Sequence, residues 1–106
     1  MAKIYVITKR PGEAPRHVWM SNTLNALQKA VDGYIETVSL PNGIVVICNE
    51  EGKLRNMPFN FRMVIGDIVG PVVICGRNGD EFGDLPYSFD DMKKLMPQLW
   101  IDQEAE

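Results

Sequence analysis

A group of polar side chains follows an apolar run near the middle of the chain, and it is the part best suited to binding chemistry. The apolar run, residues 44–48, is short, β-branched and uncharged, which predicts a strand buried on both faces. Loops fixed by a rigid strand are where binding groups usually lie. We therefore expect a ligand-binding site at the end of this strand, formed by Asn49, Glu50, Lys53, Arg55, Asn60 and Arg62.

These residue types suit a ligand that carries phosphate. The lysine and the two arginines would meet phosphates through charge-assisted hydrogen bonds, and the asparagines would read a base or a sugar. The side chains converge on one binding site only if the intervening loop is anchored by its apolar residues Leu54, Met57 and Phe59. The alternative is that the charges form a solvated rim around the strand end.

No arrangement of reactive side chains predicts catalysis. His17 is the only histidine, so neither a histidine-paired hydrolase nor a multi-histidine metal site can form within one chain, and a structural role is favoured. Cys48 and Cys75 lack a second pair at zinc spacing, and we expect both to be buried, free thiols. The adjacent Glu50 and Glu51 point to opposite sides of a strand end. We expect a protein that is not an enzyme and has no metal and no cofactor.

Two further features have ordinary structural interpretations. The segment GRNGDEFGD, residues 76–84, mixes glycines and acids but lacks the residue order of a calcium loop or a phosphate-binding loop, which predicts a plain, mobile loop. Four aromatic residues would be able to stack on a base, although packing in the core is favoured. They are Trp19, Tyr34, Phe59 and Phe61.

Composition limits the architecture and the partners. With 106 residues, 45% of them hydrophobic, the chain is long enough for one small domain, which we place at residues 1–100, followed by a frayed acidic tail at 101–106. A net charge of −3 with scattered cations disfavours direct nucleic-acid binding. The N-terminal apolar run is too short for a signal peptide or a membrane span, so we expect a cytoplasmic protein without membrane contact.

Helix and strand signals predict an α+β fold. A helix is expected over Asn22 to Asp32, capped by Ser21 or Asn22, with Leu24, Leu27 and Val31 on its buried stripe. A hairpin with an Asn42-Gly43 turn of type I′ or a closely related type should join residues 34–40 to 44–48, whereas residues 54–62 should form an ordered loop.

The remaining signals complete that fold. A strand over 65–75 should break at Gly70-Pro71. A C-terminal helix should begin after Ser88 and end at Pro97. We expect a small mixed, mostly antiparallel sheet with one helix packed across a face and a short C-terminal helix. A free sheet edge favours a homo-oligomer, most simply a dimer.

Two blocks of sequence resemble a known family. TLNALQKAVDGYIETVSL, followed by IVVICNEEGKL, the asparagine at 60 and GDIVGPVVI, is similar to domain of unknown function 3846, a domain of phage and mobile-element proteins. The resemblance covers residues 3–75, leaves the C-terminal helix outside, and provides no catalytic residues. Its most distinctive positions are Gly33, Tyr34, Ile35, Glu36, Asn49, Glu50, Gly52 and Asn60.

The resemblance implies a role in the contest between a mobile element and its bacterial host. We expect a small non-enzymatic protein in the host cytoplasm that counters host defence by binding. One form sequesters an anionic nucleotide-type signal, and the other blocks a defence protein. The alternative is a structural or accessory protein of the mobile element with no defence target.

Overall fold

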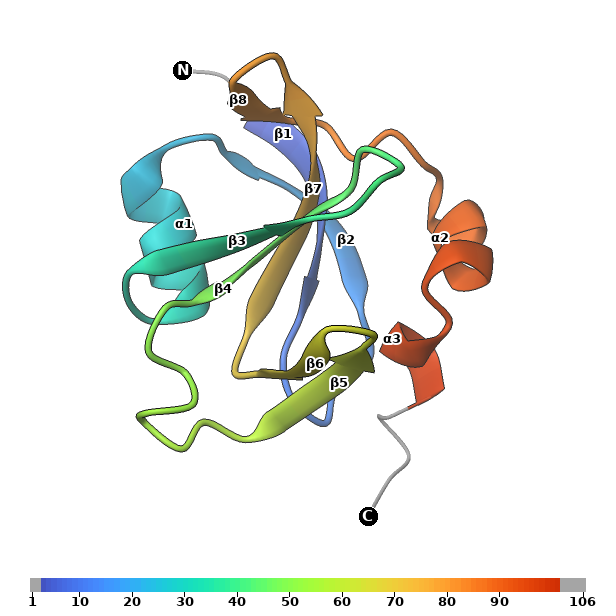
Figure 1. Cartoon of the computed structure of the whole chain (residues 1–106). Helices are drawn as coiled ribbons and strands as arrows, with labels where there is room; N and C mark the ends of the chain where they lie inside the picture. Colours follow the sequence, from blue (N-terminus) through green and yellow to red (C-terminus); the bar gives the residue numbers. More distant parts are fainter. Residues whose placement is uncertain (1–2, 102–106) are drawn as a thin grey trace.

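The computed structural model describes residues 3–101 and has the predicted α+β fold (Figure 1). Of the predicted acidic tail at residues 101–106, residue 101 is the last of α3, and residues 102–106 lie outside the described part of the chain. The strands are β1 (Lys3–Lys9), β2 (Arg16–Ser21), β3 (Ile35–Ser39), β4 (Val45–Asn49), β5 (Phe59–Met63), β6 (Gly66–Val69), β7 (Val72–Asn78) and β8 (Glu81–Gly83). The helices are α1 (Leu24–Val31), α2 (Phe89–Leu95) and α3 (Gln98–Ile101).

A six-stranded sheet forms the centre of the molecule. Its strands follow the order β2-β1-β7-β4-β3, with β8 paired to β7, and a separate two-stranded sheet consists of β5 and β6. Each pairing is antiparallel. The strand predicted at residues 44–48 corresponds to β4, which lies between β7 and β3 and is almost wholly buried, as its apolar sequence predicts.

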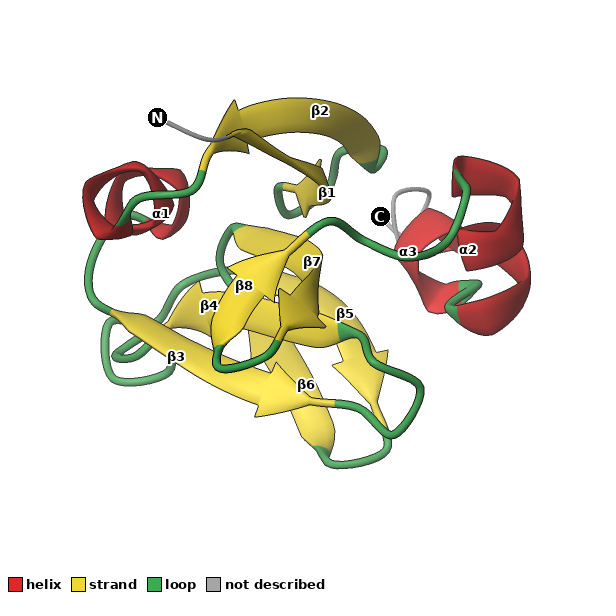
Figure 2. Cartoon of the chain, turned by 90° about the horizontal axis from the view of Figure 1, so that it is seen from above, coloured by secondary structure: helices red, strands yellow, loops and turns green. Residues whose placement is uncertain are grey.

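Alternate side chains of β4 enter two separate hydrophobic cores. Val45 and Ile47 face α1, where they pack with its buried Leu27 and Val31. Val46 lies in the other core, which β5, β6, α2 and α3 cover. Figure 2 shows α1 on one side of the sheet and α2 with α3 on the other. The sheet is therefore the middle layer of the fold.

Helix α1 begins later than its sequence suggests. Its N-cap is Thr23, whose side chain accepts a hydrogen bond from the backbone of Ala26 at 3.1 Å. The predicted cap Asn22 instead donates to the carbonyl of Phe82 at 3.0 Å, because β2 extends to Ser21 and leaves Asn22 beside β8. Leu24, predicted to lie on the buried stripe, is 59% exposed.

The β3–β4 hairpin is present, but its turn is not type I′. Gly43 has a φ of 85°, whereas Asn42 is not among the described residues with positive φ. The amide of Gly43 donates to the carbonyl of Leu40, and the amide of Leu40 donates to the carbonyl of Ile44. These bonds fit a three-residue loop with a left-handed glycine, which Pro41 favours because its ring restricts φ to negative values.

The ordered loop predicted over residues 54–62 is wrong in its second half. Residues from Phe59 onward form β5, and the pairing of β5 with β6 shifts register between Phe59 and Phe61. This bulge lets Asn60 and Phe61 both be buried, which breaks the alternation that identifies a strand. Leu54 is no anchor either, because it is 85% exposed.

The glycine-rich segment over residues 76–84 is a β-hairpin and not a plain loop. Strands β7 and β8 pair from Gly76 with Gly83 to Asn78 with Glu81, and Gly79 adopts a φ of 64° in the turn. A Cβ at Gly76 would lie 2.0 Å from the carbonyl oxygen of Asp84, so only glycine fits there. The charges that suggested a loop lie on the exposed end of the hairpin.

Other predicted features are confirmed. The strand over 65–75 breaks at Gly70-Pro71 into β6 and β7, with a φ of 76° at Gly70. Ser88 caps α2 by accepting a hydrogen bond from the amide of Asp91 at 3.0 Å, and α2 ends before Pro97. Within residues 3–101, none of the helices has the length and apolar character needed to cross a membrane.

Candidate functional site

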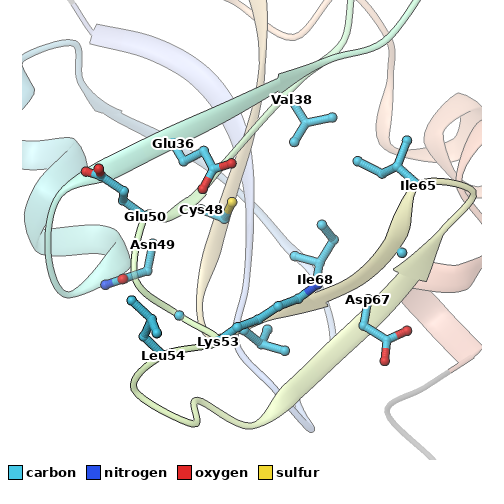
Figure 3. Close-up of a pocket in the computed structure, with 13 residues that line it drawn as sticks. Glu36, Val38, Cys48, Asn49, Glu50, Lys53, Leu54, Ile65, Asp67 and Ile68 are labelled. Atoms are coloured by element: carbon cyan, nitrogen blue, oxygen red, sulfur yellow. The ribbon is translucent and has the colours of Figure 1, made fainter.

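A cavity of about 220 Å³ lies between the β3–β4 hairpin and β6 (Figure 3). Residues from three strands and from the turn after β4 line it, although they are far apart in the sequence. They are Glu36, Val38, Cys48, Asn49, Glu50, Gly52, Lys53, Leu54, Ile65, Gly66, Asp67, Ile68 and Val69. We call this the acidic cavity.

The charges in the acidic cavity are mostly negative. Glu36 from β3 and Glu50 from the turn contribute two carboxylates and Lys53 contributes one ammonium group, whereas the third carboxylate, Asp67 of β6, pairs with Arg62 at 2.9 Å. Figure 3 shows the Glu36 carboxylate beside the Cys48 sulfur, in agreement with the pairing of these two residues across the hairpin. Coulomb attraction in such a cavity favours a cationic group over an anionic one.

The cavity contains a thiol that stays protonated near neutral pH. Burial raises the pKa of Cys48, the Glu36 carboxylate raises it further, and Lys53 opposes these effects. Cys75 is fully buried, and burial raises its pKa to about 12 against the opposing charge of Arg77. Both thiols are free. The prediction of burial holds for Cys75, whereas Cys48 is only half-buried because it borders the cavity.

Asn49, predicted to contact ligand, is 5% exposed and bonded within the chain. Its amide nitrogen donates to the carbonyl of Val31 at 2.9 Å, and its side-chain oxygen accepts from the amide of Glu51 at 2.7 Å. A Cβ at Gly33 would lie 2.7 Å from that amide nitrogen. Asn49 therefore joins the end of α1 to the turn after β4.

Asn60, at 1% exposed, has a similar structural position on the other side of the loop. Its amide nitrogen donates to the carbonyls of Lys9 and Gly70 at 3.0 and 2.7 Å. Its oxygen accepts from the Lys9 ammonium at 2.8 Å. These bonds tie β5 to the ends of β1 and β6, and Asn60 does not line the acidic cavity.

The two predicted arginines also lie outside the cavity lining. Arg55 donates to the carbonyl of Asp32 at 2.9 Å and so covers the C-terminal end of α1. Arg62 pairs with Asp67 at 2.9 Å on the exposed side of the β5–β6 hairpin. Of the six predicted site residues, the structure brings together only Asn49, Glu50 and Lys53 at the cavity.

The sequence contained one signal for the residues that were missed. Glu36 is the only charged residue of its strand, so its side chain had to face either solvent or a site. It faces the acidic cavity. Val38, Asp67 and Ile68 carried no comparable signal, because their approach depends on how β6 packs against the β3–β4 hairpin.

Histidine and aromatic groups elsewhere have packing partners. The His17 ring nitrogen Nδ1 bonds the hydroxyl of Tyr5, and its ring stacks on Phe89 with centroids 4.6 Å apart. Phe61 is fully buried, whereas Trp19 and Tyr34 are 62% and 68% exposed, so core packing accounts for only part of the aromatic set. Throughout residues 3–101, His, Cys, Asp and Glu side chains form no cluster of three or more suited to a metal ion.

Comparison with known proteins gives one match. The family described as Domain of unknown function (DUF3846) matches residues 3–99. This match is longer than the resemblance over residues 3–75, because it also includes α2 and the start of α3. No curated protein and no solved structure matches the chain.

Proposed function

The chain belongs to the family described as Domain of unknown function (DUF3846), and we propose that it is a non-enzymatic protein that binds and blocks a protein of bacterial defence. The acidic cavity carries this proposal. Its Glu36 and Glu50 carboxylates outnumber its single lysine, and Asp67 already pairs with Arg62, so the cavity suits the basic side chains of a protein better than the phosphates of a nucleotide.

The surroundings of the cavity support a protein partner. Leu54, Val64 and Ile65 are 85%, 107% and 68% exposed, and they come from the turn after β4 and the β5–β6 turn. Exposed apolar groups beside charged ones are typical of surfaces that bind proteins. The assignment to defence follows from the sequence resemblance to phage and mobile-element proteins, and an accessory role in the mobile element is the alternative.

Nucleotide sequestration is the second candidate, and a different cavity favours it. This cavity of about 220 Å³ lies at the β1–β2 turn, and its lining includes Arg10 and Arg16 together with Glu13. Two guanidinium groups on one cavity suit a phosphate-bearing ligand. None of the six predicted site residues lines this cavity, although its lining includes Lys9, which bonds Asn60.

One purification separates the two forms. The tagged protein is expressed in cells with an active defence system, and the purified material is divided between nucleotide mass spectrometry and protein mass spectrometry. We expect a defence protein in the complex, inhibition of that protein by added pure chain, and no nucleotide. Recovery of an intact nucleotide without such a protein would replace blocking by sequestration, and absence of both would favour the accessory role.

A further inference from the structure

A second cavity continues the acidic cavity along the sheet edge. Glu36 and Val38 of β3 line the acidic cavity, and Leu40, the next residue on the same side, lines an apolar cavity of about 200 Å³. The other residues around it are Met63, Val64, Ile65, Leu95, Met96 and Gln98. Ile65 borders both cavities, so they adjoin beside β3, and we call the two together the β3 groove.

The backbone along the β3 groove has a free edge. Strand β3 is last in the sheet order, and in the described part of the chain it pairs with β4 alone. Strand β6, on the opposite side of the groove, pairs only with β5 within the same residues. An extended segment can therefore pair with β3 through backbone hydrogen bonds and point alternate side chains into the groove.

We propose that the β3 groove binds an extended segment of a partner protein as an added strand. A lysine or arginine of that segment enters the acidic cavity, and an apolar side chain about four residues away enters the apolar cavity. The spacing follows from Glu36 and Leu40, which are about 13 Å apart at the rise of a strand. The proposal rests on the proposed protein-blocking function and specifies how the partner is recognised.

Charge complementarity selects this occupant over a second copy of the chain. The acidic half carries the Glu36 and Glu50 carboxylates against one ammonium group, and its third carboxylate, Asp67, already pairs with Arg62. A second copy that added its own β3, residues IETVS, would bring the Glu36 carboxylate and no cation. A basic segment of another protein reduces the repulsion among the carboxylates, whereas a second β3 increases it.

Synthetic peptides test the groove directly. The probes are two fluorescent, end-blocked peptides of roughly nine alternating threonine and valine residues, with arginine four positions before or after a leucine. Anisotropy titrations with the pure chain should show that at least one of the two peptides binds. Glutamate in place of arginine should weaken binding about tenfold or more, as expected for loss of a charge-assisted contact. N-methylation of alternate amides should abolish binding.

Protein variants locate the bound peptide. The double variant Glu36→Gln/Glu50→Gln should weaken the arginine peptide about tenfold, whereas Glu51→Gln, a neighbouring exposed carboxylate outside the cavity lining, should have no effect. Leu95→Ser should weaken both leucine peptides, and Leu24→Ser, an exposed leucine on α1, should not. Lys53→Gln should strengthen binding about twofold or more because a like charge is removed.

The outcomes separate this inference from the function on which it rests. If the wild-type chain inhibits a defence protein but the Glu36→Gln/Glu50→Gln and Leu95→Ser variants inhibit it equally well, groove recognition is overturned and protein blocking stands. If the peptides bind as expected but no defence protein is inhibited, the groove stands and its biological partner belongs elsewhere. Absence of peptide binding, or equal binding of the arginine and glutamate peptides, overturns the groove.

Discussion

The two faces of the central sheet differ in how completely they are covered. On one face, α1 packs Leu27 and Val31 onto β4 and β7, and these helix residues are at most 2% exposed. On the other face, β5, β6, α2 and α3 cover the middle of the sheet but stop short of its β3 margin, where the acidic cavity opens. Both faces carry a buried core, and the margin of the second also leaves room for a partner.

This difference follows from where the covering elements lie on each face. A helix of eight residues lies across the strands and brings two apolar side chains into the core. On the other face, the four-residue strand β6 lies across the acidic cavity from β3, so the two strands are not packed together along that margin. Charged groups from β3, from β6 and from the turn after β4 meet at this cavity.

The largest expected effect compares a core residue under α1 with a half-buried residue at the β3 margin of the other face. Leu27→Ala should lower the free energy of unfolding by about 3 kcal/mol, because it opens a void under α1. Val38→Ala, at the half-buried margin, should lower it by about 1 kcal/mol, since the side chain already borders a cavity. Urea denaturation of both variants measures the difference. Equal losses would show that the two faces are equally well packed.

The second effect concerns two of the predicted site residues. Asn49→Ala should lower the free energy of unfolding by about 2 kcal/mol, because the carbonyl of Val31 and the amide of Glu51 lose their partner. Arg55→Ala should cost about 0.5 kcal/mol or less, because its hydrogen bond is exposed. Urea denaturation again provides the measurement. An Asn49→Ala variant with wild-type stability would contradict the structural role of Asn49 and favour a role in ligand binding.

The smallest effect is on thiol reactivity. With a thiol reagent followed by mass spectrometry, native Cys48 should react faster than Cys75, and unfolding should make both react quickly. Because the pKa of Cys48 is raised, its rate should keep rising with pH above the ordinary range of a thiol. Glu36→Gln should speed the reaction at a given pH, since the carboxylate is one cause of the raised pKa.

A matched variant decides whether this reactivity reports the cavity. Lys53→Gln should slow Cys48 labelling, because the ammonium group lowers the pKa of that thiol. Neither change should affect Cys75, which lies in the core on the α1 side. Identical labelling rates of Cys48 in the two variants would show that neither Glu36 nor Lys53 influences the pKa of this thiol. That result would weaken the comparison between the two faces.

Local patterns determined most of the secondary structure. The β-branched run before Asn49 predicted a doubly buried strand, Gly43 predicted a turn, Gly70-Pro71 predicted a break, and Ser88 predicted a helix start. Each of these signals depends on backbone preferences of a few neighbouring residues. For that reason these structures could be predicted from the sequence without any knowledge of the fold.

Tertiary structure alone decided which polar groups are structural and which border a cavity. Asn49 and Asn60 read as ligand contacts in sequence, but their carbonyl partners at Val31, Lys9 and Gly70 come close only after folding. The bulge in β5 likewise removes the alternation on which strand prediction depends. The acidic cavity combines β3, β4 and β6, and its charges become neighbours because the β5–β6 hairpin packs short of the sheet edge, a distance that no local pattern encodes.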